Sequence, residues 1–189
     1  INCKRKKIVA NLYYLVAQLP SFSQTAEGGK LPITTEYFIE LCSRFMKGKS
    51  LETVKNLSLE PPKEACSTGS SFLDTWYSKE RNLRFALAQV RALKMRKEVK
   101  DIPITSDGEV VQAARTATGM DSPLSAELFL NEYRLGVLDK ITPLDMFSED
   151  AVYSYGLHLM LAERMRKFNK EEGISSYHKL YDEILGSSK

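Results

Sequence analysis

The sequence has few of the residues that build covalent frameworks or metal centres: its 189 residues include three cysteines and two histidines. Cys3, Cys42 and Cys66 lie far apart and form no CxxC pair, which excludes a disulfide framework and is typical of a reducing compartment. His158 and His178 have no metal-ligand spacing to cysteines or carboxylates. We therefore expect no metal site, and we expect Cys42 and His158 to be core residues rather than a nucleophile and a ligand.

The sequence also lacks the short motifs of common catalytic sites. It contains no GxGxxG, GxxxxGK[ST], GxSxG or HExxH segment, so phosphate binding, acyl transfer and zinc hydrolysis have no support in it. The adjacent acids Glu149 and Asp150 point about 100° apart on a helix, which is typical of a solvated surface rather than of a general acid and base. The sequence therefore predicts a protein that is not an enzyme and that uses no cofactor and no small-molecule substrate.

Long apolar segments are absent as well. No run approaches the roughly 20 apolar residues that a membrane-spanning helix needs. Lys4 to Lys7 precede an apolar run at residues 8–19, which is the order of a secretory signal, but Asn11 and Gln18 interrupt the run and no small-residue cleavage site follows. These features predict a cytoplasmic protein.

The formal net charge of +3 comes from one end of the chain. Four of the 27 basic residues are Lys4, Arg5, Lys6 and Lys7, and the other 23 nearly match the 24 acidic residues. A neutral body lacks the overall field expected of a dedicated nucleic-acid binder, although it leaves room for a local basic patch. We predict a basic tail at residues 1–11, a candidate for disorder, and a single helical domain at residues 12–189.

The feature that dominates the sequence is a segment of strong helix formers without Gly or Pro, from Phe72 to Lys100. It predicts one long helix, and because most of its perimeter is apolar, we expect other helices to cover it on several sides. One narrow stripe on it is charged and contains Glu80, Arg84, Arg91 and Glu98. If helices cover this stripe, its charges must be paired, because an unpaired buried charge costs several kcal/mol. The stripe is then a device for interhelical registry or a partner-binding site.

The rest of the pattern predicts an all-α, bundle-like fold of about seven helices around this long one. A second long helix begins after Ser148 and runs to about Glu172. Residues 12–19, LYYLVAQL, predict a short strand or a buried extended segment, and residues 58–71, rich in Pro, Ser, Thr and Gly, predict a mobile loop. A last helix is capped by Ser175 or Ser176. Four of its side chains are expected in the core: Tyr177, Leu180, Tyr181 and Ile184.

Three stretches are distributed over most of the length of the chain: YYLVAQLPSFS near its start, W-Y-x-x-E-R-N-L-R-x-A-L-x-x-x-R-A-L-K from Trp76, and FSEDAVYSYGLHLMLAERMRKF from Phe147. Together they resemble a family of small bacterial proteins of unassigned biochemistry that is associated with V-type ATPase gene clusters. That family is similar to a shortened form of the C-type subunit of archaeal-type and V-type ATPases, known as the d-type subunit in eukaryotes. The C-type subunit is an all-helical, non-catalytic socket that sits on the membrane rotor ring and receives the foot of the central stalk. Because this chain is much shorter, the resemblance implies part of a socket, a socket formed by pairing, or an assembly factor.

The resemblance implies a non-catalytic accessory or coupling subunit of a bacterial V-type ATPase, which links the central stalk and the rotor ring or assists assembly. Such a protein would serve proton or sodium ion transport by binding these subunits, and it would lie in the cytoplasm at the periphery of the inner membrane, in contact with the membrane only through its partners. The alternative is a helical nucleic-acid-binding module that uses Lys4 to Lys7 and the basic end of the long helix, Arg91 to Lys100. An affinity for nucleic acid that falls steeply with added salt would distinguish the nucleic-acid-binding module from the ATPase subunit.

Overall fold

A computed structural model describes residues 12–21, 31–64, 66–97, 102–105, 107–167 and 170–186. In these ranges the protein is all-α and contains no strand, which confirms the predicted class. Residues 12–18 are helical. The helices that follow are α2 (Thr35–Phe45), α3 (Lys49–Lys55), α4 (Ser71–Lys94), α5 (Gly108–Gly119), α6 (Pro123–Ile141), α7 (Glu149–Arg166) and α8 (Lys170–Gly186). The predicted basic tail at residues 1–11 lies outside the described residues.

The prediction of a strand or extended segment at residues 12–19 is wrong, because residues 12–18 are helical. Leu12 and Leu15 are buried in the core, and Val16 and Leu19 pack against it. These four positions are three or four residues apart, which places them on one face of a helix, whereas a strand would alternate its side chains. The described residues also offer this segment no second strand with which to pair.

Helix α4 occupies most of the predicted long helix but ends at Lys94, before the predicted end at Lys100. Its last turn closes in a Schellman motif: Arg96 adopts a left-handed conformation with φ 54°, and the N–H of Lys97 donates to the carbonyl of Ala92 at 2.9 Å. Glycine is the usual residue at such a position. The sequence has Arg96 there, so no glycine marked the position where the helix ends.

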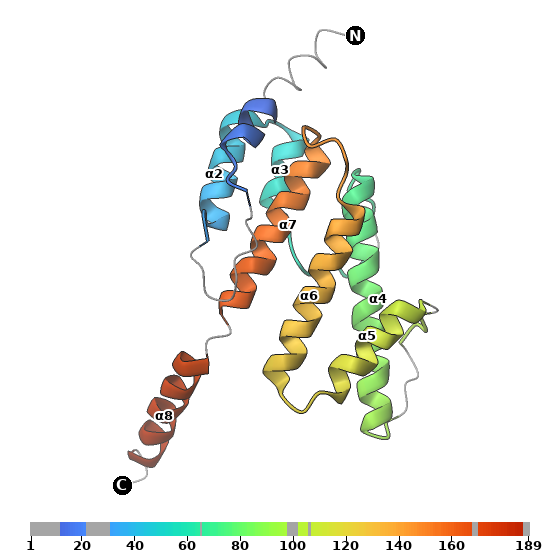
Figure 1. The fold of residues 1–189 in the computed structure, drawn as a ribbon, viewed down its shortest axis with the longest axis vertical. Helices are drawn as coiled ribbons and strands as arrows, with labels where there is room; N and C mark the ends of the chain where they lie inside the picture. The colour runs from blue at the N-terminus through green and yellow to red at the C-terminus, as the bar shows by residue number, and fades with distance from the viewer. Residues whose placement is uncertain are drawn as a thin grey trace.

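Helix α7, rather than α4, contacts the largest set of neighbours. It packs against α2, α3, α4 and α6, whereas α4 packs against α5, α6 and α7, and Figure 1 shows α7 between α2 and α6 with α4 at the side of the bundle. Leu93 and Met95 at the end of α4 are exposed. The predicted central position of α4 is therefore not confirmed.

Buried apolar side chains form two clusters. The larger one joins residues 12–18, α2, α3, the first half of α4, the second half of α6 and α7, and it contains Phe38, Trp76 and Leu157. The smaller one lies between the second half of α4, α5 and the first half of α6, and it contains Leu83 and Ala114. Both clusters therefore draw on α4 and α6, and each of these two helices passes from one cluster to the other.

Close packing of α7 against its neighbours depends on Gly156. A Cβ at this position would lie 2.9 Å from Cδ1 of Leu57 and 2.9 Å from Cε1 of Phe38. Gly136, inside α6, is a matched position without this constraint, because no described atom lies within 4 Å of the Cβ that it would carry. The two glycines therefore separate the effect of packing from the effect of helix propensity.

We expect Gly156→Ala to lower the free energy of unfolding by about 1–2 kcal/mol, because overpacking at Phe38 and Leu57 outweighs the gain in helix propensity. Gly136→Ala should raise it by about 0.5–1 kcal/mol, because it gains only the propensity term. Urea denaturation followed by circular dichroism measures both changes. Equal changes in the free energy of unfolding for the two variants would contradict the close approach of Phe38 and Leu57 to Gly156.

Helix α8 departs most from expectation. It begins at Lys170 rather than after Ser175 or Ser176, and α7 ends at Arg166 rather than near Glu172. All side chains of residues 173–185 are exposed, and Figure 1 shows α8 leading away from the other helices. The predicted burial is wrong for all four residues of that set, Tyr177, Leu180, Tyr181 and Ile184. The apolar spacing was recognised correctly, but this chain does not cover the face that it creates.

In the predicted loop at residues 58–71, the described residues up to Ser70 are non-helical and Ser71 begins α4; the mobility of the loop stays a prediction. Its described part is anchored to α4. Thr68 donates to the Asp74 carboxylate through its backbone N–H and through its hydroxyl, each at 2.8 Å, and Arg81 donates to the carbonyl of Pro62 at 2.9 Å. Within the described ranges, none of the helices is long and apolar enough to cross a membrane.

Candidate functional site

The first half of the predicted charged stripe is a buried ion-pair network. The Glu80 side chain is 1% exposed, and its Oε1 accepts from Nε of Arg84 at 2.9 Å. Arg134 of α6 completes the network with a bidentate pair, in which Nε donates to Oε2 at 2.9 Å and Nη2 donates to Oε1 at 3.0 Å. Two parallel N–H···O bonds of this kind fix the orientation of the partners as well as binding them. Sequence reasoning missed Arg134, because nothing local in the sequence relates it to Glu80.

The network lies at the boundary between the two apolar clusters. On α4, Glu80 lies between Trp76 in the larger cluster and Leu83 in the smaller one. On α6, Arg134 lies between Leu130 in the smaller cluster and the residues around Val137 in the larger one. A shift of one helix along the other would break the bidentate bonds and leave charges buried, which costs several kcal/mol. This position supports the registry interpretation for this half of the stripe.

Beyond Glu80, the described residues of the stripe are partly or fully exposed. Arg84 is 37% exposed, and its Nη1 lies 3.6 Å from a carboxylate oxygen of Glu60, a largely exposed residue. Arg91 is exposed at the surface of α4. Glu98 lies outside the described residues. The structure therefore does not join the four predicted residues into one site: Glu80 and Arg84 meet, and Arg91 lies apart from them.

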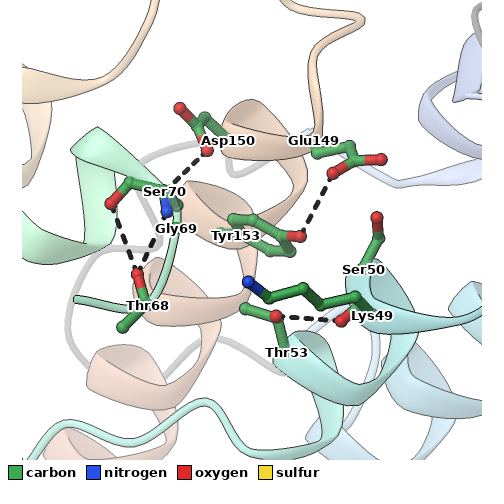
Figure 2. Close-up of a pocket in the computed structure, with 9 residues that line it drawn as sticks. All are labelled: Lys49, Ser50, Thr53, Thr68, Gly69, Ser70, Glu149, Asp150 and Tyr153. Atoms are coloured by element: carbon green, nitrogen blue, oxygen red, sulfur yellow. Dashed lines mark hydrogen bonds between the residues drawn. The ribbon is translucent and has the colours of Figure 1, made fainter. Parts of the chain in front are cut away.

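A second polar group joins the beginnings of three helices (Figure 2). It surrounds a pocket of about 110 Å³ lined by residues of α3, of the loop that ends at the N-cap of α4, and of the beginning of α7. The Ser70 hydroxyl donates to Asp150 at 2.7 Å and accepts the N–H of Leu73 at 3.1 Å. Ser70 thus caps α4 and binds α7 at once. Gly69, at φ 88°, makes the turn into this cap, and a Cβ there would lie 2.9 Å from Nζ of Lys49.

The polar contacts of this pocket connect the beginning of α4 to the beginning of α7. Asp150 lies in the first turn of α7, where a carboxylate interacts favourably with the helix dipole. Tyr153 extends toward Glu149, with its hydroxyl 3.5 Å from the carboxylate (Figure 2). Because Ser70 caps α4 and also donates to Asp150 of α7, the arrangement is that of a structural joint.

The burial of tyrosine side chains in and near this joint predicts how the free energy of unfolding changes at alkaline pH. Desolvation, followed by the charge of Glu149, raises the pKa of Tyr153 to about 12. Desolvation also raises the pKa of Tyr155 to about 12. Each raised pKa contributes stability that is complete below pH 10, where unfolded tyrosine is neutral, and that is lost as the pH rises from 10 to 12.

We expect the free energy of unfolding to fall between pH 10 and pH 12 with a slope of about 1.4 kcal/mol per pH unit for Tyr153. Tyr153→Phe should lower this slope, because it removes the ionising group from both states. Urea unfolding at a series of pH values gives the slope, and absorbance at 295 nm follows tyrosinate formation in the folded protein. A slope that does not change in Tyr153→Phe would contradict the raised pKa.

Cys42 has the buried environment that the sequence predicted, whereas the side chain of His158 is 19% exposed and lies outside the buried core. Cys42 is fully buried, and desolvation raises the pKa of its thiol to about 12, so a thiolate nucleophile is disfavoured. The His158 ring is engaged at both nitrogens, with Nδ1 2.8 Å from the carbonyl of Ser154 and Nε2 3.0 Å from Oδ1 of Asp139. The described part of the chain contains no cluster of three or more His, Cys, Asp or Glu residues placed to hold a metal ion.

Asn131 is fully buried on α6, and in the described part of the chain both polar atoms of its amide are without a hydrogen-bond partner. A buried amide in this state costs about 1–3 kcal/mol. It lies one turn before Arg134, so polar groups continue along the inner face of α6. Sequence reasoning did not single out Asn131 either.

No known protein family, curated protein or solved structure matches this chain.

Proposed function

We propose that the protein works by binding and that helix α8 is its docking element. The observation that carries this proposal is the exposed apolar face of α8. At 100° per residue, its large apolar side chains fall within an arc of about 140° and its charged residues fall mainly on the opposite side. The exposed residues that define this apolar face are Ile174, Tyr177, Leu180, Tyr181, Ile184 and Leu185.

An isolated amphipathic helix of this length is only marginally stable in water. The 17 residues of α8 are close to the length below which single helices are marginal, because most helix stability in proteins comes from packing of the apolar face. Tyr177 is 63% exposed, and its ring stacks on Tyr181 with centroids 6.1 Å apart. Aromatic residues in this arrangement are typical anchors for a helix that binds in an apolar groove.

The finer proposal is that the partner belongs to a bacterial V-type ATPase, as a central-stalk or rotor-ring subunit. It is supported by the three resembling sequence stretches, of which those beginning at Trp76 and Phe147 fall on α4 and α7. Both helices contribute to the larger apolar cluster, and α8 extends away from the bundle that contains it (Figure 1). In this role the chain would couple the two parts of the rotor or assist their assembly from the cytoplasmic side, without catalysis.

Co-elution of the purified chain with purified central-stalk and rotor-ring subunits in gel filtration tests this proposal. We expect a stoichiometric complex with one of them that persists at 0.3 M salt, because apolar burial rather than charge drives it. A clean absence of complex with both would remove the V-type ATPase proposal.

Duplex and single-stranded DNA, added in place of those subunits, test the alternative function. Arg91, Arg96 and Lys97 are exposed at the end of α4, whereas Lys94 donates to the carbonyl of Thr118 at 2.9 Å and so binds the last turn of α5. Affinity for DNA that falls steeply with added salt would favour the nucleic-acid-binding module. We expect no such affinity, because the described basic cluster is small and one of its members is engaged.

A further inference from the structure

The end of the bundle remote from α8 carries a second set of exposed apolar side chains (Figure 1). They come from the helical residues 12–18 and from the connection between α6 and α7, residues 142–148. The two segments meet where the ring of Tyr13 packs against the ring of Phe147, with centroids 5.1 Å apart. The exposed members of this surface, which we call the apolar tip, are Tyr13, Tyr14, Leu144, Met146 and Phe147.

Hydrogen bonds hold the connection between α6 and α7 in place at both of its ends. The Thr142 hydroxyl lies 2.7 Å from the Ser154 hydroxyl of α7. At the other end, the Asp145 carboxylate accepts the backbone N–H of Phe147 at 3.1 Å. Leu144, between these two contacts, is fully exposed. Because these contacts exist before any partner binds, insertion of the tip costs less conformational entropy than insertion of an unstructured loop.

The composition of the tip fits the interfacial layer of a lipid bilayer. Tyrosine is enriched at that depth, because its ring is apolar and its hydroxyl stays hydrated. Leu144 and Met146 are among the most exposed apolar side chains of the described residues, and both could enter the acyl region. Side chains that protrude in this way suit a fluid layer, whereas a protein partner needs a surface of matching shape.

A basic segment precedes the tip in the sequence. Lys7, the last residue of the tetrad Lys4 to Lys7, lies five residues before Leu12, a chain length that spans at most about 18 Å. Its charge therefore stays near the tip. Asp145 and Glu149 are acidic and would oppose contact with an anionic surface on their own. Apolar anchors next to a polybasic segment are the two signals that together give stable attachment to anionic lipids.

The exposed face of α8 is less suited to such a surface. The sequence of α8 contains four acidic and two basic residues, whereas helices that lie on anionic membranes are rich in Lys and Arg on their polar face. Charge therefore assigns a lipid contact to the tip rather than to α8.

We propose that the apolar tip binds directly to the surface of a bilayer that contains anionic lipids, with Leu144, Met146 and the two tyrosines inserted and Lys4 to Lys7 over the headgroups. The site depends neither on α8 nor on an ATPase subunit, so it goes beyond the proposed function. It also differs from the expectation that the chain meets the membrane only through its partners. With the tip on the membrane, α8 at the other end stays available to a protein partner.

Co-sedimentation of the full chain with lipid vesicles tests this site. We expect binding to phosphatidylcholine vesicles that contain about 30% phosphatidylglycerol, and at least tenfold weaker binding to phosphatidylcholine alone. Leu144→Asp should weaken binding to the anionic vesicles at least tenfold, because insertion would bury a carboxylate. Leu93→Asp makes the same change at an exposed leucine near the end of α4, remote from the tip (Figure 1). It should bind within about threefold of the wild type, because salt screens its charge over that distance.

Two further variants separate the basic segment and α8 from the tip. Replacing Lys4 to Lys7 by glutamine should weaken binding to the anionic vesicles at least a hundredfold, whereas Leu180→Asp on α8 should bind them as the wild type does. Thermal unfolding without lipid should be unchanged in Leu144→Asp, because the side chain is fully exposed. A wild-type chain that does not sediment with anionic vesicles would overturn the proposal and leave the tip to a protein partner. Equal binding of Leu144→Asp and Leu93→Asp, with loss in Leu180→Asp, would overturn it in favour of α8.

Discussion

Replacing Glu80 by Gln should lower the free energy of unfolding by about 3–5 kcal/mol, the largest effect that we expect from a single isosteric change. The Glu80 carboxylate is the only anionic partner of Arg134 among the described ion pairs, and the side chain of Arg134 is 6% exposed. Glutamine would keep one acceptor but leave the guanidinium charge buried without compensation. Urea denaturation followed by circular dichroism gives the change in free energy.

Two further variants separate the network from a general sensitivity of α4. The double variant Glu80→Leu, Arg134→Met removes both charges together and should unfold within about 1–2 kcal/mol of the wild type, because apolar residues of similar volume commonly replace a buried pair without loss. Arg84→Gln should cost about 1 kcal/mol or less, because Arg84 is 37% exposed and water screens its bond to Glu80. A double variant as unstable as Glu80→Gln would contradict the assigned role of the pair.

A charge placed on the apolar face of α8 should abolish partner binding without affecting the fold. We expect Leu180→Asp to weaken binding to the central-stalk or rotor-ring subunit by at least a hundredfold, because an unpaired carboxylate would be buried in the complex. Ser175→Asp adds the same charge to the opposite face of the same helix and should change affinity less than threefold. Isothermal titration calorimetry with the purified subunit gives both values.

The free energy of unfolding serves as the control for these two variants. Leu180 and Ser175 are both exposed on α8, so each variant should unfold within about 0.5 kcal/mol of the wild type. Equal affinities of Leu180→Asp and Ser175→Asp for the partner would contradict docking through the apolar face. If Leu180→Asp lost stability and Ser175→Asp did not, the apolar face of α8 would pack against the bundle in solution.

The start of α7 was predictable because it is a local event: the hydroxyl of Ser148 accepts the backbone N–H of Ala151 in the first turn. Residues 12–18 were misassigned because a short apolar run fits both periods, and only packing against the core decides between them. The end of α4 was misplaced because Arg96 occupies a position where glycine is the usual signal.

The candidate site was predictable only in part, for a related reason. The i, i+4 spacing of Glu80 and Arg84 is visible on one helix, but Arg134 lies 54 residues farther along the chain and meets Glu80 only after α4 and α6 pack. The amphipathic pattern of α8 was also visible. A sequence does not distinguish an apolar face that packs on its own core from one that remains exposed, because the spacing of residues is the same in both cases.

Hydrogen exchange with mass spectrometry, on the chain alone and mixed with the purified central-stalk and rotor-ring subunits, tests the docking role of α8 most directly. In the free chain, amides of residues 170–186 should exchange rapidly, because no neighbouring helix covers them. In the complex, protection should rise over these residues and stay unchanged over residues 71–94. No change in protection over residues 170–186 in a mixture where the complex forms would contradict the account.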